Sequence, residues 1–128
     1  MTDYLLDTQA FLWFVVGDAR MSPRVRAAIG TAPGVYVSAA TAWEIRTKYR
    51  LGKLPEAEFF VSDLAGAVAR EEFRELPIQF ADGELAGSFA SAHRDPFDRM
   101  IAAQSINHRL MLVSSDAALD AFGVVRVW

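Results

Sequence analysis

The stretch Tyr4–Val16, YLLDTQAFLWFVV, defines the first unit of the fold. Its first three residues are apolar and predict a short buried strand, and Thr8–Val16 predicts a helix that is apolar on nearly every side. Asp7 stands between these two segments. Because a carboxylate at the end of a buried strand costs free energy unless a partner satisfies it, Asp7 is the first candidate for a functional residue.

The alternation of strand and helix continues to the end of the chain. Further strands are predicted at Val35–Val37, Phe73–Ile78, Leu110–Val113 and Val124–Val127. Further helices are predicted at Pro23–Ala32, Ala39–Leu51, Glu56–Glu72, Asp82–Ala92, Pro96–Arg109 and Ala117–Ala121. Pro77 cannot donate a ladder hydrogen bond, which favours an edge position for the strand that contains it. Apolar strands that alternate with helices predict an α/β fold with a mostly parallel sheet.

Composition narrows the class of protein. A chain of 128 residues, of which 52% are apolar, predicts one folded domain over residues 1–128. The chain has no cysteine, which excludes disulfides, zinc–thiolate sites and thiol nucleophiles. The longest apolar run, Ala10–Val16, is too short to cross a bilayer, so a soluble cytoplasmic protein is expected. The net charge of -3 argues against broad, non-specific binding of nucleic acid.

Four acidic residues follow the predicted strands or open the helices after them: Asp7, Glu44, Asp98 and Asp116. The carboxyl ends of parallel strands meet at one edge of a sheet, which is where ligands bind in such folds. Carboxylates gathered there repel one another unless cations lie between them, and Mg²⁺ prefers oxygen ligands. The pattern therefore predicts a metal-assisted reaction, such as cleavage of a phosphodiester.

Each acid also has an ordinary structural explanation. Asp7 and Asp116 can cap the helices that follow them, and Thr41–Glu44 matches a capping box. Asp95 and Asp98 fit the start of a helix that has proline in its first turn. What favours a shared site is that these acids stand among apolar residues with few Lys or Arg close in sequence, so that a cation would satisfy them together.

Four segments, in this order, resemble the PIN-domain ribonucleases and, more narrowly, the VapC-type toxins of bacterial toxin–antitoxin pairs: YLLDTQAFLWFV (4–15), VSAATAWEIRTKYRLGKL (37–54), HRDPFDRMIAAQS (93–105) and LVSSDAAL (112–119). Each motif alone is weakly specific, but the series covers nearly the whole chain. The resemblance implies a PIN-like three-layer α/β/α sandwich with a central, mostly parallel sheet. Gln9 stands where relatives often carry His or Asn, outside the acidic set.

The resemblance implies a Mg²⁺-dependent endoribonuclease toxin, with Mn²⁺ as an alternative metal. Asp7 and Asp98 match the primary metal ligands of the family, Glu44 its middle acid and Asp116 its last, more variable acid. One or two metal ions among these catalytic acids would activate a water that attacks the RNA phosphodiester. The hydroxyl of Thr8 is a candidate supporting group.

Cations near the acids are candidates for RNA contacts. Arg46 lies on the predicted Glu44 helix, and Arg94 and Arg99 flank the third acid. They are interpreted equally as a rim that binds phosphates or as solvated helix faces, and Lys48 as an ordinary i, i+4 partner of Glu44. The resemblance implies two protein partners, an antitoxin that covers the acidic groove and a second copy of the chain in a homodimer.

Alternatives remain open at this point. Asp95 is interpreted as a helix cap, with metal binding as the alternative, and His93 as a surface residue or cap partner. The main alternative function is a catalytically silent PIN-fold module that acts only through a protein or RNA partner. A haloacid-dehalogenase-type phosphatase would need a second Asp where Gln9 stands, and a receiver domain would need a Lys near Ser114–Asp116.

Overall fold

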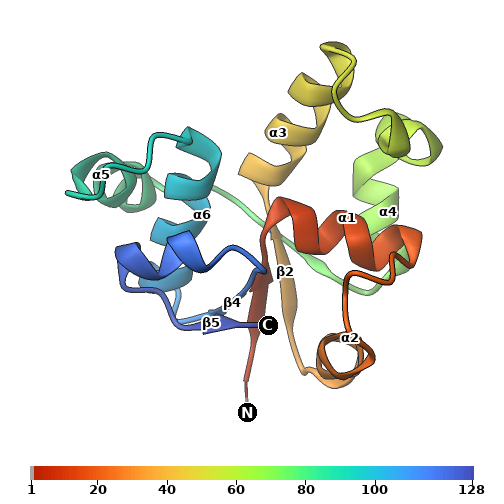
Figure 1. Ribbon diagram of the computed structural model, residues 1–128, viewed down its shortest axis with the longest axis horizontal. Coiled ribbons are helices and arrows are strands. Elements are labelled where there is room, and N and C mark those ends of the chain that lie inside the picture. The colour runs from red at the N-terminus through yellow and green to blue at the C-terminus, as the bar shows by residue number, and fades with distance from the viewer. Residues whose placement is uncertain (1) are drawn as a thin grey trace.

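Five short strands lie side by side in one sheet (Figure 1). The computed structural model describes residues 2–128. The strands are β1 Tyr4–Leu6, β2 Val35–Ser38, β3 Arg74–Leu76, β4 Met111–Val113 and β5 Arg126–Val127. Their order is β3-β2-β1-β4-β5, and every neighbouring pair is parallel. Leu6 pairs with Val37 and with Val113, so the three central strands end level at one edge.

Helices connect the strands, and several of them begin after a capping residue. The α-helices are α1 Thr8–Val16, α2 Pro23–Thr31, α3 Ala39–Arg50, α4 Leu64–Arg70, α5 Phe80–Ser88 and α6 Pro96–Asn107. The 3₁₀ helices are η1 Pro55–Phe59, η2 Val61–Asp63 and η3 Ala117–Phe122. Ser22 and Ser38 cap α2 and α3 with side-chain oxygens that accept backbone N–H groups of the first turn.

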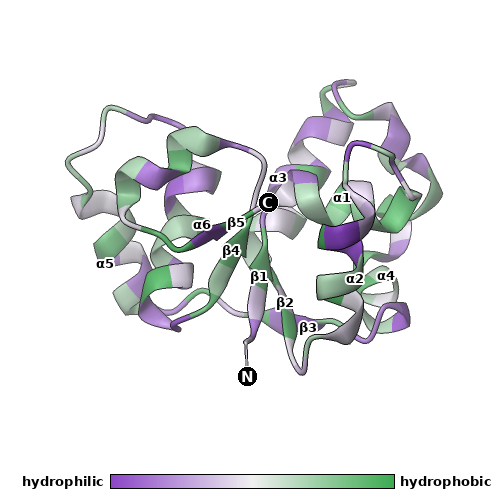
Figure 2. Ribbon diagram, turned by 60° about the horizontal axis from the view of Figure 1, so that its bottom comes forward, coloured by the Kyte–Doolittle hydropathy of each residue, from purple (hydrophilic) through white to green (hydrophobic). Residues whose placement is uncertain are grey.

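The sheet separates two hydrophobic cores. Successive residues of a strand face opposite sides, so Leu6 packs in the core beneath α1, α2 and α4, and Leu5 packs in the core that contains α6 and η3. Figure 2 shows the apolar strands β2 and β4 between the two groups of helices. This arrangement confirms the predicted three-layer α/β/α sandwich, with a sheet that is wholly rather than mostly parallel.

The single long helix predicted over Glu56–Glu72 is wrong. The segment forms η1, η2 and the short helix α4, because the backbone at Phe60 leaves helical geometry with φ -140° and ψ -2°. That break buries Phe60 and leaves Phe59 90% exposed. The Asp63 side chain then accepts from the Gly66 N–H at 2.9 Å and starts α4. Burial of one aromatic ring has outweighed helix propensity here.

The helix predicted over Asp82–Ala92 starts earlier and ends earlier, as α5. Gln79 caps it, and the Asp82 carboxylate accepts from the Gln79 N–H at 2.9 Å, so Asp82 is the third helical residue of a capping box. The edge position predicted for the strand before Pro77 is confirmed, since β3 ends the sheet on one side. Every helix within residues 2–128 falls short of the length and apolarity that a membrane span requires.

Candidate functional site

The level carboxyl ends of the central strands carry the acidic residues to one place. Asp7 follows β1 directly, and its N–H donates to the Val113 carbonyl of β4 at 3.1 Å. Asp116 follows β4, Asp98 lies in the first turn of α6, and Glu44 lies in the second turn of α3. These four acids and Asp95 line one pocket of about 330 Å³. Residues that are up to 109 positions apart in the sequence therefore share one cavity.

Three of these acids cap helices as well. Asp7 Oδ1 accepts from the Ala10 N–H at 2.7 Å, and Asp116 Oδ1 accepts from the Ala118 N–H at 3.0 Å. Asp95 Oδ1 accepts from the N–H groups of the first turn of α6 at 2.9 and 3.2 Å. Capping and a shared site are thus compatible, because each cap uses only Oδ1. The N-termini of α1 and α6 both meet the pocket, where their partial positive charge favours carboxylates.

The capping box suggested for Thr41–Glu44 is absent from α3, as Ser38 caps this helix and Glu44 lies deeper in it. The Glu44 side chain is buried and both of its oxygens are bonded. Thr8 Oγ1 donates to Glu44 Oε1 at 2.5 Å and lies 3.1 Å from Thr41 Oγ1. Glu44 Oε2 accepts a hydrogen bond from Lys48 Nζ. Thr8, which the sequence suggested as a supporting group, therefore orients one of the predicted acids.

Asp98 is paired with a residue that the sequence interpretation left outside the site. His93 Nε2 lies 2.9 Å from Asp98 Oδ2, and both side chains are about three-quarters buried. Burial and the nearby carboxylates of Asp95 and Glu44 raise the pKa of Asp98 above its ordinary value, although the bond to His93 opposes this. The sequence does place His93 in the same motif as Asp98. The two residues are joined by a loop without regular structure, however, so their separation along the chain did not predict that the side chains meet.

Asp7 shows the strongest electrostatic effect in the pocket. Burial raises its pKa from 3.8 to about 6, against the opposing hydrogen bonds from Ser114 and Ala10. The carboxylates of Asp98 and Glu44 add to the rise by repulsion. A carboxylate at a strand end that is 8% exposed therefore holds its proton more tightly than one in water. A cation in the pocket would reverse that effect.

The donor chemistry of the pocket fits a divalent cation, because five carboxylates supply the oxygen ligands that Mg²⁺ and Mn²⁺ prefer. Within residues 2–128, however, no three or more His, Asp or Glu side chains are placed so that they could hold one metal ion together. One oxygen of Glu44 accepts a hydrogen bond from Lys48, and one oxygen of Asp98 lies within hydrogen-bond distance of His93 Nε2.

The arginines predicted at the rim have different environments. Arg46 Nη1 donates to the Val61 carbonyl at 3.0 Å. The Arg99 guanidinium donates to four backbone carbonyls between Ala86 and His93 at 2.7–3.2 Å. Arg94 is exposed. Phosphate binding stays a prediction for all three, and Arg46 as well as Arg94 is exposed to solvent.

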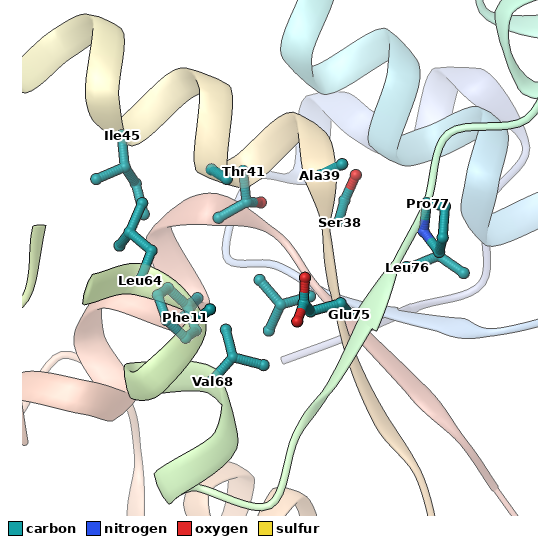
Figure 3. A pocket seen from close by; sticks show the side chains of 13 residues that line it. Phe11, Ser38, Ala39, Thr41, Ile45, Leu64, Val68, Glu75, Leu76 and Pro77 are labelled. Carbon is teal, nitrogen blue, oxygen red and sulfur yellow. The ribbon is translucent and has the colours of Figure 1, made fainter. Parts of the chain in front are cut away.

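A second cavity, of about 310 Å³, lies between α3, α4 and β3 (Figure 3). Its walls are mainly apolar, with Phe11, Ile45 and Val68 among them, and the carboxylate of Glu75 is its main charged group. None of the predicted acids lines it. The chemistry of the site therefore belongs to the acidic pocket.

Comparisons with known proteins bear on the family and the fold of this chain. A family model described as "PIN domain" matches residues 4–125. No curated protein matches the chain. A chain in the crystal structure of FitAcB from Neisseria gonorrhoeae is 24% identical with a TM-score of 0.67, over 98% of this chain and 96% of that chain.

Two further solved structures are similar at lower identity. A chain in DNA-bound VapBC from Salmonella typhimurium has a TM-score of 0.73 at 16% identity, over 100% of this chain and 98% of that chain. A chain in a toxin–antitoxin complex from Klebsiella pneumoniae has a TM-score of 0.60 at 16% identity, over 98% of this chain and 96% of that chain. At such identities the likeness establishes a common fold.

Proposed function

This chain belongs to the PIN-domain family, and we propose that it is a metal-dependent endoribonuclease, the VapC-type toxin of a toxin–antitoxin pair. The observation that carries the proposal is the pocket at the carboxyl edge of the sheet, which five carboxylates from four separate parts of the chain line together. A protein has little structural reason to gather so much negative charge in a half-enclosed space, because each carboxylate there raises the cost of ionising the others.

Asp7, Glu44, Asp98 and Asp116 are the residues that would hold Mg²⁺ or Mn²⁺. Such an ion, when bound, supplies positive charge to the phosphate and a more acidic water. The chain's own groups prepare the acids for this role. Thr8 fixes one oxygen of Glu44, His93 fixes one oxygen of Asp98, and the α1 amides fix one oxygen of Asp7. Orientation of ligands by such neighbours is the usual requirement of a metal site.

Substrate phosphates need positive charge outside the acids. Arg94 is exposed, and it directly precedes Asp95, which lines the pocket. Its side chain is free to reach an RNA strand that lies across the opening. The net charge of -3 supports binding that depends on these local cations and on metal rather than on the whole surface.

We further propose an antitoxin partner and a homodimer. The toxin–antitoxin complex from Klebsiella pneumoniae and the VapBC structure support the first of these through their common fold. Exposed apolar side chains support protein partners in general: Trp43 is 60% exposed, Phe59 90% and Phe80 86%. Sedimentation of the purified chain, alone and with the product of a neighbouring small gene, tests both partners.

The function is tested by incubating total RNA with the purified chain in Mg²⁺, and then with excess EDTA. Cleavage is expected only with Mg²⁺, and Asp7→Asn or Asp98→Asn is expected to lower its rate at least a hundredfold. Glu58→Gln is the matched control, because Glu58 is exposed and lies outside the pocket. Sequencing of the new 5′ ends identifies the RNA and the position of the cut.

Cleavage that persists in EDTA, or that survives both substitutions, rejects the metal mechanism. Absence of cleavage in every condition favours the catalytically silent module, which the pairing of Glu44 with Lys48 and of Asp98 with His93 also fits.

A further inference from the structure

One cationic side chain lines the acidic pocket. Among the described residues that form its wall, Lys48 is the only Lys or Arg, beside five carboxylates. The other cations of α3, Arg46 and Arg50, line a separate surface hollow with Tyr49. Lys48 is thus distinguished from its neighbours on α3 by where its ammonium lies, which the i, i+4 spacing to Glu44 does not reveal.

The contact between Lys48 and Glu44 is an ion pair at the wall of the pocket. Lys48 Nζ donates to Glu44 Oε2, the oxygen that Thr8 leaves free. The Glu44 side chain is 6% exposed and the Lys48 side chain 41% exposed. The acid is therefore held in place by the fold, whereas the flexible lysine stem reaches solvent and can move away without a change in α3.

The electrostatic environment keeps the ammonium in the pocket when no other cation is present. Lys48 Nζ bonds to the buried carboxylate of Glu44, and Asp95 and Asp98 line the same pocket. A lysine side chain carries a positive charge at physiological pH. It relieves part of the repulsion among the carboxylates that a metal would otherwise relieve.

A divalent cation that binds Glu44 Oε2 competes there with the ammonium of Lys48. Two cations at one carboxylate oxygen lie close together and repel each other. The free energy of the ion pair is therefore subtracted from the free energy of metal binding through this oxygen.

We propose that Lys48 is the resident counter-ion of the acidic pocket and competes with the divalent cation for Glu44, so that it sets the metal affinity of the site. This inference rests on the proposed metal-dependent function. It assigns to Lys48 a positioning role on Glu44 that ends when metal binds.

The test is a titration of the EDTA-stripped full chain with Mn²⁺ alone, followed by calorimetry or by the electron paramagnetic resonance signal of free Mn²⁺. Lys48→Met is expected to bind Mn²⁺ about tenfold more tightly than the unsubstituted chain, because a positive charge beside the ligand is lost. Lys53→Met is the matched control, since Lys53 is exposed and outside the pocket, and it is expected to change the affinity less than twofold.

A second variant guards against loss of folding. Lys48→Gln removes the charge but keeps an N–H donor for Glu44, and it is expected to tighten Mn²⁺ binding in the same direction. If Lys48 only stabilises α3 as an i, i+4 pair, both variants lower the melting temperature and leave Mn²⁺ affinity unchanged or weaker. That result overturns the inference.

The outcomes separate this inference from the proposed nuclease. Mn²⁺ binding that tightens in Lys48→Met supports the inference even if no RNA is cut, and in that case only the nuclease proposal fails. Mn²⁺ binding of equal strength in all variants rejects the inference and leaves the nuclease intact. Absence of Mn²⁺ binding in the unsubstituted chain and in every variant rejects both.

Discussion

Asp7 serves two purposes that act in opposite directions on stability. Its Oδ1 accepts from the Ala10 N–H and begins α1, which stabilises the fold. Its burial, and its repulsion by Asp98 and Glu44, raise its pKa to about 6, which destabilises the ionised form. Because the unfolded chain holds this proton only below about 3.8, the native state loses stability as the pH rises from about 4 to 6.

Asp7→Asn is therefore expected to make the metal-free protein more stable at neutral pH. Asparagine keeps the cap but has no charge, so the gain in the free energy of unfolding should approach 3 kcal/mol, about what the pKa shift corresponds to, at pH 7.5. The gain should disappear near pH 3.5, where aspartate is protonated in both states. Urea denaturation in EDTA at both pH values measures the difference, with Glu58→Gln as control.

A destabilising Asp7→Asn at pH 7.5 would show that the carboxylate is already neutralised in solution. An equal gain at both pH values would point to packing rather than to charge.

The loop between α5 and α6 illustrates how one side chain shapes an element. The Arg99 guanidinium donates to the carbonyls of Ala86, Phe89, Ser91 and His93. Five N–H donors in a planar group are suited to holding an irregular backbone in this way. The loop that Arg99 fixes carries His93 to Asp98, so Arg99 acts on the pocket from outside it.

Arg99→Met is expected to loosen residues 89–95 and to lower the free energy of unfolding by about 2 kcal/mol, since several partly buried carbonyls lose their donor. Amide hydrogen exchange should show faster exchange confined to this loop. Arg94→Met, in the same loop but exposed, is expected to leave stability unchanged and to weaken RNA binding. If both variants exchange equally, the guanidinium contacts do not hold the loop.

A second buried acid joins α5 to α6 at the far end from the pocket. Asp82 accepts from the Gln79 N–H, from Asn107 Nδ2 at 2.9 Å and from His108 Nε2 at 3.3 Å. Burial alone would raise its pKa, but the bonds from Asn107, Gln79 and His108 prevail and hold the pKa below 3.8. Its stabilising effect is therefore present above pH 3.8 and is lost as the pH falls through the lower native pKa.

Asp82→Ala is expected to lower the free energy of unfolding by about 3 kcal/mol at pH 7, because it removes a buried carboxylate that accepts hydrogen bonds from Gln79, Asn107 and His108. The difference should shrink as the pH falls below 3.8, because the unfolded carboxylate takes up its proton there before the native one does. Asp120→Ala is a suitable control, as the Asp120 side chain is exposed and, among the described residues, bonds only to Arg126. Denaturation curves at pH 7 and below pH 3.8 measure this loss of unfolding free energy. A loss of equal size at both pH values would show that the charge of Asp82 does not contribute to stability.

The charged side chains of the molecule are distributed unevenly, with a concentration of carboxylates in one pocket. The chain has a net charge of only -3, yet five carboxylates and one lysine line a single pocket. A ligand that binds the native state and not the unfolded chain raises stability in proportion to the logarithm of its concentration. A divalent cation in this pocket should act in that manner, because repulsion between Asp7, Asp98 and Glu44 is part of the native state alone.

Mn²⁺ or Mg²⁺ at about 100 times its dissociation constant is expected to stabilise the protein by about 2.7 kcal/mol, which corresponds to a rise of several degrees in melting temperature. The double variant Asp7→Asn, Asp98→Asn should show no rise. Differential scanning calorimetry with metal and with EDTA measures this change in melting temperature. A rise of equal size in the double variant would place the metal elsewhere.

The amino-acid sequence by itself indicated the alternation of strands and helices and the residues at which β1 and β4 end. Apolar runs such as Tyr4–Leu6 and Met111–Val113 have no polar face, so they can lie only inside a sheet covered on both sides. Caps such as Ser22 and Asp95 act within three residues of themselves. Such patterns involve residues that are close together in the sequence, so they can be recognised without the tertiary structure.

Only the tertiary structure decided how the polar side chains pair. Thr8 bonds to Glu44 across 36 positions, and Ser38 bonds to buried Gln104 across 66. Three further features were also missing from the sequence prediction: the helix break at Phe60, the contact of His93 with Asp98, and the position of Lys48 at the pocket wall. Each depends on distances between segments that meet only when the sheet has formed, and a buried polar group takes whichever partner the packing brings within reach.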